Sequence, residues 1–210
     1  MDFENIYKSR KNVLKMLKLR GYDTTQYDNQ NKDELMVLFQ NRDKKTAKIN
    51  DTIDILIEGE KNKIFVKYIL TDKTRSKAIE KFLESYYYEE EFLEKTDECV
   101  FITKDKVSIN GNLESFMNSL YQIDSIFSQV IHLSSLLYDL TLNKLVPKYR
   151  ILNDEEKANV LKKYNIKDEK LLPNLLITDS LAIYYGVKLN QIVEIYNGKS
   201  KYYRLCIPSY

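Results

Sequence analysis

The chain has 210 residues, of which 43% are hydrophobic and 30% charged, and its formal net charge is +2. Only 5 glycines and 3 prolines argue against a disordered chain, and no apolar run is long enough to span a membrane, so no membrane association is predicted. The single histidine and two distant cysteines exclude a His/Cys zinc site, and neither a glycine-rich phosphate loop nor a Gly-x-Ser-x-Gly nucleophile elbow occurs. Carboxylates, lysines or a carboxylate-held metal are the remaining catalytic options.

Residues 1–142 predict a mixed α/β domain. Apolar residues recur every three or four positions over Phe3–Arg20, a helix that Asp2 would cap and Gly21 would end. The period then changes to that of strands over 54–58 and 63–70, which are rich in β-branched residues and flank a turn at 59–62. The other predicted elements are helices over 33–40, 75–93 and 113–120 and strands over 98–103, 130–133 and 136–142.

Residues 143–210 predict a second, compact α+β domain. The boundary near Asn143 rests on pattern and charge: residues 1–142 hold 21 basic and 24 acidic residues (net −3), and residues 143–210 hold 12 and 7 (net +5). Asn153 and Glu156 form a capping-box pattern at the start of a helix. A second helix over 179–185 would end at Gly186, and strands over 191–196 and 202–207 would form a hairpin.

A metal-dependent nuclease is one alternative for the first domain. In such enzymes an Asp on one strand and a Glu-x-Lys on the next hold Mg²⁺ and activate water. Asp54 and Lys67 stand on neighbouring predicted strands, but the position of the Glu is occupied by Phe65, which cannot ligate a hard cation. Solvated charges on a hairpin explain these residues better.

An ordered series of short motifs runs through the second domain. The pieces are Leu145-Val-Pro-Lys-Tyr149, Leu152-Asn-Asp-Glu-Glu-Lys157, Lys163-Tyr-Asn-Ile-Lys167, Leu172-Pro173, Thr178-Asp-Ser-Leu-Ala-Ile-Tyr-Tyr-Gly186, Gln191-Ile-Val-Glu-Ile195 and Tyr202-Tyr-Arg-Leu205. In this order and near these spacings they resemble the assembly domain of the fifth subunit shared by eukaryotic nuclear RNA polymerases, a domain that has a counterpart in the archaeal polymerase. The resemblance covers about 65 residues, which is roughly the size of a small domain.

The chain departs from the family pattern at several positions. Tyr149 stands where the family has histidine, Asn174 where it has arginine, Ser180 where it has proline, and Leu189-Asn190 where it has Arg-Gly. These departures concern surface details and indicate a divergent member. The chain is rich in Lys, Asn, Ile and Tyr, an amino-acid usage that indicates an A+T-rich genome, such as that of a protist or a large DNA virus.

The resemblance implies a jaw domain over residues 1–142 and an assembly domain over residues 143–210. It implies a non-catalytic subunit, without cofactor or metal, that docks on the largest polymerase subunit and lines the channel for downstream duplex DNA. The implied interface residues are Leu145, Val146, Pro147, Lys148, Tyr149, Pro173, Asp179, Tyr184, Gly186, Tyr203 and Arg204. The loop after the strand over 98–103 would approach DNA through Lys104, Lys106 and Asn110.

The location depends on the source of the chain. It would be nuclear if the polymerase is cellular, and the virion or a cytoplasmic viral factory if the polymerase is viral. Besides the nuclease, a stand-alone nucleic-acid-binding protein remains an alternative, although a net charge of +2 favours weak binding by the isolated chain.

Overall fold

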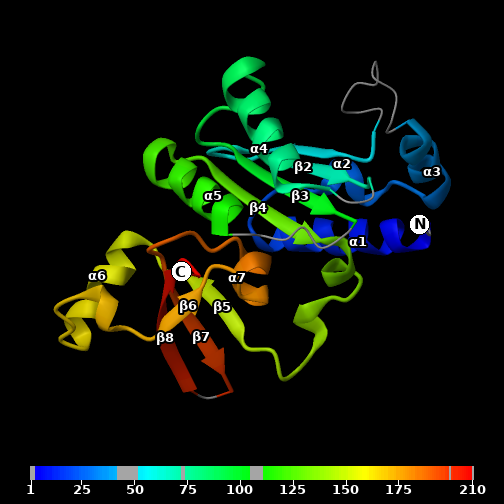
Figure 1. The fold of residues 1–210 in the computed structure, drawn as a ribbon. Helices are drawn as coiled ribbons and strands as arrows, with labels where there is room; N and C mark the ends of the chain where they lie inside the picture. Colours follow the sequence, from blue (N-terminus) through cyan, green and yellow to red (C-terminus); the bar gives the residue numbers. More distant parts are fainter. Residues whose placement is uncertain (1–2, 42–51, 72–73, 105–110, 199, 210) are drawn as a thin grey trace. The chain divides into compact units, whose positions relative to one another are not determined.

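The computed structural model describes residues 3–41, 52–71, 74–104, 111–198 and 200–209 (Figure 1). The chain divides into two units, Met1–Tyr138 (unit 1) and Asp139–Tyr210 (unit 2). Each unit holds one small mixed sheet with helices, which confirms the prediction of a mixed α/β protein. Among the described residues, no helix combines the length and the apolar character needed to cross a bilayer.

The sheet of unit 1 has the strand order β1-β2-β3-β4. Its strands are β1 (Ile55–Glu58), β2 (Lys63–Ile69), β3 (Glu98–Thr103) and β4 (Phe127–His132). β1 and β2 form the predicted antiparallel hairpin, whereas β2, β3 and β4 run parallel. All six residues of β3 are buried, as expected for a central strand covered on both faces.

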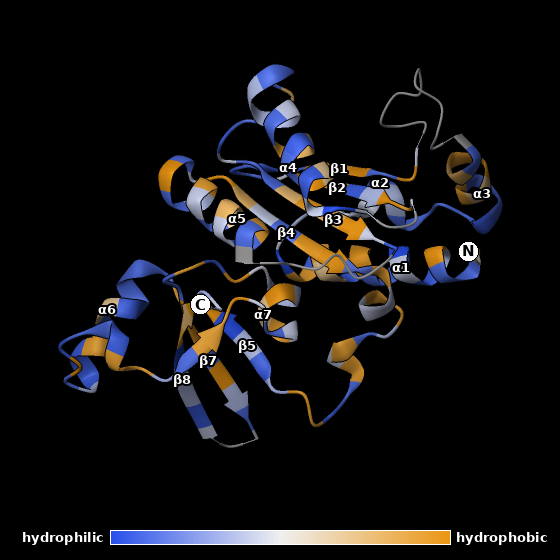
Figure 2. Cartoon of the chain, in the orientation of Figure 1, coloured by the Kyte–Doolittle hydropathy of each residue, from blue (hydrophilic) through white to orange (hydrophobic). Residues whose placement is uncertain are grey.

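Five α-helices are described in unit 1: α1 (Phe3–Leu19), α2 (Thr25–Asp28), α3 (Lys32–Asn41), α4 (Ser76–Glu84) and α5 (Gly111–Asp124). Figure 1 shows α4 and α5 on one face of the sheet and α1 on the other. Ile79 of α4 and Leu113 of α5 pack with Phe65 and Phe101 of the strands in one core. Figure 2 shows the hydrophobic residues concentrated along these strands, where burial removes the most apolar surface from water.

The end of α1 follows its sequence signal. Gly21 has φ +95°, and the backbone N–H groups of Gly21 and Tyr22 donate to the carbonyls of Lys18 and Leu17 at 3.1 Å each. This is a Schellman motif, which glycine favours because it has no Cβ to clash at positive φ. The predicted cap residue Asp2 lies outside the described residues.

One helix prediction for unit 1 is wrong in part. The helix expected over 75–93 ends as α4 at Glu84 and is followed by a π-helical turn, Ser85–Glu89. Tyr86 packs edge-on to Phe65 with ring centroids 5.4 Å apart, while the next residue, Tyr87, is also buried and donates its hydroxyl to the Asp97 carbonyl at 3.0 Å. Both tyrosines of this turn therefore contact the core of unit 1, Tyr86 through its ring and Tyr87 through its ring and hydroxyl.

The strand expected over 136–142 is also wrong. The strand before it, β4, begins at Phe127 and not at Val130, and two 3₁₀ turns follow at Leu133–Leu136 and Leu140–Leu142. Asp139 accepts a hydrogen bond from the Thr141 backbone N–H at 2.9 Å and thereby starts the second turn. Local side-chain caps of this kind compete with the ladder of a sheet.

The sheet of unit 2 has the strand order β5-β7-β8-β6. Its strands are β5 (Lys148–Ile151), β6 (Asn174–Leu176), β7 (Ile192–Asn197) and β8 (Ser200–Ile207). The β7–β8 hairpin was predicted, and β5 pairs antiparallel with β7 while β6 pairs parallel with β8. The short edge strands β5 and β6 were not predicted, because three or four residues carry little periodicity.

The helices of unit 2 lie on opposite faces of its sheet. α6 (Asp154–Lys163) begins with the predicted capping box of Asn153 and Glu156, and α7 (Ser180–Tyr185) ends at Gly186 with φ +68°. One face buries Val193, Ile195 and Cys206 with Ala182 of α7. The other face buries Leu152, Leu172, Ile192 and Leu205, with Val160 and Leu161 of α6 packed against them.

Candidate functional site

The first candidate surface lies at the start of unit 2. Leu145 is 88% exposed, and the neighbouring Leu142 is 75% exposed. Val146 and Pro147 are partly buried, and Lys148 is exposed. Removing exposed aliphatic side chains of this size from water lowers the free energy. A partner that covers them is therefore bound more tightly. We define Leu142 and Leu145 as the leucine pair.

Tyr149, another interface candidate, lies at the edge of the core of unit 2. It is partly buried beside α7, where its ring lies 5.5 Å from that of Tyr185, centroid to centroid. Burial raises the pKa of Tyr149 to about 12, so the phenol is neutral at physiological pH.

The candidates around α7 hold the helix itself. The Asp179 carboxylate accepts hydrogen bonds from the backbone N–H groups of Leu181 and Ala182 at 2.9 and 3.2 Å, and Gly186 supplies the left-handed end. Tyr184 is 4% exposed, so its side chain is buried inside unit 2 and offers almost no surface to a partner. These residues shape the surface that a partner would meet, but only Asp179 is itself exposed.

The remaining interface candidates lie on β8 and beside β6. Pro173 is exposed, and its carbonyl accepts from the Leu205 backbone N–H at 3.0 Å. Arg204 donates to the Asn174 carbonyl at 3.1 Å, which ties β8 to β6. Tyr203 instead points to the opposite face of the sheet, into a polar network.

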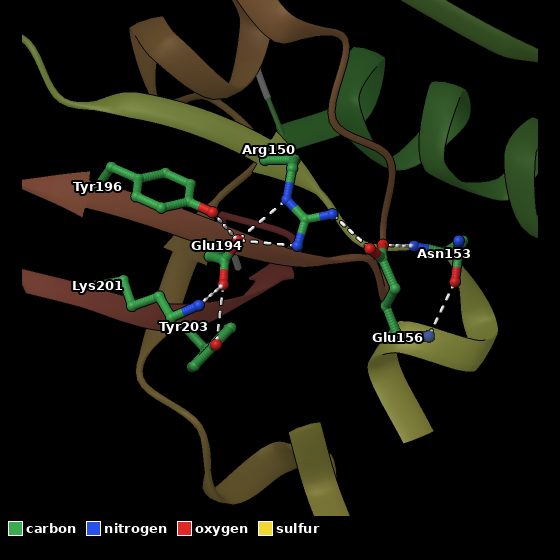
Figure 3. A network of polar contacts seen from close by, with 7 residues as sticks. All are labelled: Arg150, Asn153, Glu156, Glu194, Tyr196, Lys201 and Tyr203. Carbon is green, nitrogen blue, oxygen red and sulfur yellow. Dashed lines mark hydrogen bonds and ion pairs between the residues drawn. The ribbon is translucent and has the colours of Figure 1, made fainter. Parts of the chain in front are cut away.

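That network centres on Glu194, which is 1% exposed in the middle of β7 (Figure 3). Its carboxylate accepts from Arg150 Nε at 3.0 Å, forms an ion pair with Arg150 Nη2 at 2.9 Å, and accepts from the Tyr203 hydroxyl at 2.9 Å. Lys201 Nζ lies at 3.1 Å, and the Tyr196 hydroxyl also donates. Arg150 further bonds Glu156, the capping-box residue of α6. The seven residues drawn in Figure 3 are called the Glu194 network: Arg150, Asn153, Glu156, Glu194, Tyr196, Lys201 and Tyr203.

The electrostatics of the network follow from these contacts. Burial acts to raise the pKa of Glu194, but the hydrogen bonds from Tyr196, Arg150, Tyr203 and Lys201 outweigh it and lower the pKa to about 2. Hydrogen bonding to Glu194 raises the pKa of Lys201. Burial and the bond to Glu194 raise the pKa of Tyr203. Glu194 therefore stays ionised at neutral pH, and Lys201 and Tyr203 stay protonated.

Sequence reasoning did not identify the Glu194 network. The signal was present, since a glutamate interrupts the apolar run Ile192-Val-Glu-Ile195 of a predicted strand. A buried carboxylate requires partners. The main partner, Arg150, lies 44 positions away on β5, a strand that was not predicted.

The DNA-proximal candidates are described only in part. Lys104 follows the end of β3, and its backbone N–H donates to the Ile69 carbonyl at 3.1 Å. Lys106 and Asn110 lie outside the described residues. Their approach to DNA stays a prediction.

The alternative nuclease site is filled by structural contacts. The expectation of solvated charges is wrong for Asp54, which is 5% exposed. Its carboxylate pairs with Lys67 Nζ at 2.6 Å and accepts the Tyr68 backbone N–H at 2.9 Å. Phe65 lies two residues before Lys67 on β2, so it shares that face of the sheet, and it belongs to the apolar core with α4 and α5. Within the described ranges, no group of three or more His, Cys, Asp or Glu residues is placed to hold a metal ion.

Replacing Asp54 by asparagine tests this structural role. Asp54→Asn leaves Lys67 without its ion pair, so we expect unit 1 to lose about 1–2 kcal/mol of its free energy of unfolding, measured by urea denaturation. We expect neither the native chain nor the variant to cleave duplex DNA with Mg²⁺. Cleavage by the native chain that disappears in the variant would instead support the nuclease.

Comparisons with known proteins address the family. A family model described as RNA polymerase Rpb5, C-terminal domain, matches residues 138–206. "DNA-directed RNA polymerase subunit 5-like protein 1" of Arabidopsis thaliana is 30% identical over 202 residues, covering 92% of this chain and 89% of the relative. "DNA-directed RNA polymerases I, II, and III subunit rpabc1" of Dictyostelium discoideum is 26% identical over 221 residues, covering 98% and 99%. "DNA-directed RNA polymerase subunit Rpo5" of Thermococcus onnurineus is 36% identical over 75 residues, covering 33% of this chain and 90% of the archaeal protein.

These matches confirm the resemblance that the motif series indicated. Two relatives align along nearly the whole chain, and the family model falls almost entirely within unit 2. The chain belongs to the subunit 5 family of DNA-directed RNA polymerases and is a non-catalytic subunit of such a multisubunit transcription enzyme.

Proposed function

We propose that residues 143–210 form an assembly domain that docks on the largest polymerase subunit, while residues 1–142 form a jaw that lines the downstream DNA channel. The exposed leucine pair carries the docking part of this proposal. Leu145 lies in the proposed assembly domain and Leu142 directly precedes it. Both belong to unit 2, which begins at Asp139, and to the segment that the family model matches. Covering both side chains supplies apolar burial at roughly 25 cal/mol per Å² of surface.

The archaeal relative supports unit 2 as the docking part. The match with this chain covers 90% of the archaeal protein but only 33% of this chain, a share of the size of one unit. A chain with little beyond such a domain must make its polymerase contacts through it. A nuclear location follows if the polymerase is a cellular enzyme of the kind named for the Dictyostelium relative.

The jaw part of the proposal requires only a local contact with DNA. Residues 1–142 have a net charge of −3, so unit 1 has no overall attraction for DNA. The proposed contact is local, at Lys104 and the segment after β3. Cations held near a duplex by a larger assembly position the DNA without reading its sequence.

The docking surface is tested by charge substitution in the leucine pair. We expect the double variant Leu142→Asp and Leu145→Asp, tagged and purified in high salt from the native source, to recover at least about tenfold less of the largest subunit than the native chain does. Quantitative mass spectrometry of the co-purifying chains measures this ratio. The reason is that two carboxylates buried in an apolar interface lose hydration without gaining partners.

Ile123 provides the matched control for this experiment. It is 79% exposed on α5 of unit 1, so Ile123→Asp makes one apolar-to-aspartate substitution of the same kind outside the proposed surface. We expect recovery equal to that of the native chain. Full recovery with the double leucine variant, or equal losses with both variants, would refute docking through the leucine pair.

The DNA-channel assignment predicts weak binding by the free chain. We expect its dissociation constant for a labelled 20-base-pair duplex to exceed about 10 µM at physiological salt, measured by fluorescence anisotropy. Tight and strongly salt-dependent binding would favour the stand-alone nucleic-acid-binding protein.

A further inference from the structure

We propose that the groove between α6 and the outer face of β5 and β8 in unit 2 binds an acidic peptide segment of a partner protein. The groove has a volume of about 230 Å³. Its lining includes three cations and an apolar floor: Arg150, Lys163, Lys201, Leu152 and Val160. All of them belong to unit 2, and none belongs to the leucine pair, so this inference does not depend on the docking surface proposed above.

The carboxylates of the groove are already satisfied. Glu194 accepts hydrogen bonds from Arg150, Lys201, Tyr196 and Tyr203 (Figure 3). Glu156 accepts one bond from Arg150 through Oε1 and another from the backbone N–H of Asn153 through Oε2. Carboxylate oxygens with these partners offer little further acceptor capacity to a ligand.

The cations, by contrast, keep unused donors. An ammonium group can donate three hydrogen bonds, and Lys201 Nζ is engaged with one oxygen of Glu194. Within the described residues, Lys163 lies with its ammonium over the Tyr164 ring at 5.3 Å and has no carboxylate within ion-pair distance. Three cations against two carboxylates leave the groove with a net positive charge, so a complementary ligand supplies acceptors and negative charge.

The remaining lining favours a peptide over a nucleic acid. Leu152 is buried and Val160 partly buried, and together they offer an aliphatic floor beneath the cations. A peptide in which acidic residues flank an aliphatic residue matches both the cations and the aliphatic floor of the groove. A phosphate backbone has no aliphatic group to place on this floor.

The test uses the full chain and a fluorescein-labelled peptide of sequence EELEELEE, in low-salt buffer, with fluorescence anisotropy as readout. We expect saturable binding that weakens at least about tenfold when every glutamate of the peptide is replaced by glutamine. Lys163→Glu removes one free cation and adds an anion, so it should weaken binding about tenfold.

Lys162 is the matched control, because it is exposed on the same helix next to Lys163 but does not line the groove. Lys162→Glu makes the same change in net charge and should alter the affinity less than about twofold. Amide chemical shifts that move with the peptide should fall on α6 and β8. Absence of binding at ~1 mM peptide would overturn the proposal. Equal losses of peptide affinity in the two lysine variants would also overturn it. So would a single-stranded DNA that displaces the labelled peptide and shifts the same amide signals.

Discussion

Phe101→Ala is expected to lower the free energy of unfolding of unit 1 by about 4 kcal/mol, since truncating a buried phenylalanine removes apolar contacts and leaves a cavity. Phe101 is 0% exposed on β3, the strand between β2 and β4. Its ring lies 6.3 Å from that of Phe82, centroid to centroid, in the core that α4 and α5 cover. A central strand cannot move to fill the space without disturbing both ladders.

Hydrogen exchange of backbone amides measures this change in each unit separately. We expect amides of β3 and β4 to lose protection while those of β7 and β8 keep theirs, because the two units have separate cores. The control is Ile123→Ala, a truncation of a 79% exposed side chain that should cost less than about 0.5 kcal/mol. Equal loss of protection in both units would show that they unfold as one cooperative body.

Glu194→Gln is expected to lower the free energy of unfolding of unit 2 by about 2 kcal/mol at neutral pH. The amide keeps the shape of the side chain but removes the charge that Arg150 and Lys201 share, and its NH₂ group cannot accept from the tyrosine hydroxyls. The partners are half exposed, so water restores part of their solvation and the cost stays below that of a fully buried pair. Denaturation followed by tyrosine-ring NMR signals of Tyr196 and Tyr203 measures it.

The same variant has a defined dependence on pH. The folded chain lowers the pKa of Glu194 from 4.5 to about 2, so the unfolded chain binds this proton first as the pH falls. The stabilisation is complete above pH 4.5 and is lost between pH 4.5 and about 2. The difference between the native chain and Glu194→Gln should therefore shrink across that window.

Glu155 supplies the control for charge alone. It is exposed in the first turn of α6, next to Glu156, and Glu155→Gln should change stability by less than about 0.5 kcal/mol. A difference between Glu194→Gln and the native chain that stays constant from pH 7 to 2 would contradict the assigned pKa.

Local structure in this protein was largely predictable from the sequence. Helix ends at Gly21 and Gly186 and the capping box of Asn153 and Glu156 formed as expected, because caps depend on residues within one turn of each other. The β1–β2 and β7–β8 hairpins followed from alternation on both sides of short turns. The ordered motifs of residues 145–205 also identified the family, without any coordinates.

Other features depended on partners that are distant in the chain. In the π-helical turn at Ser85–Glu89, Tyr86 packs beside Phe65 and Tyr87 donates to the Asp97 carbonyl, and both partners lie outside the local sequence. Asp54 is a structural residue because Lys67 and Tyr68 reach it across the sheet of unit 1.

By itself, the sequence determined the composition class, most helices and hairpins, and membership of the subunit 5 family. Only the tertiary structure decided the edge strands β5 and β6, the burial of Glu194 and the cationic groove beside it. The physical reason is the separation along the chain between the interacting residues. A cap or a hairpin is stabilised by neighbours in the chain, whereas a buried carboxylate is stabilised by charges brought from separate strands. Arg150 reaches Glu194 across 44 positions, a pairing that only the register of β5 against β7 creates.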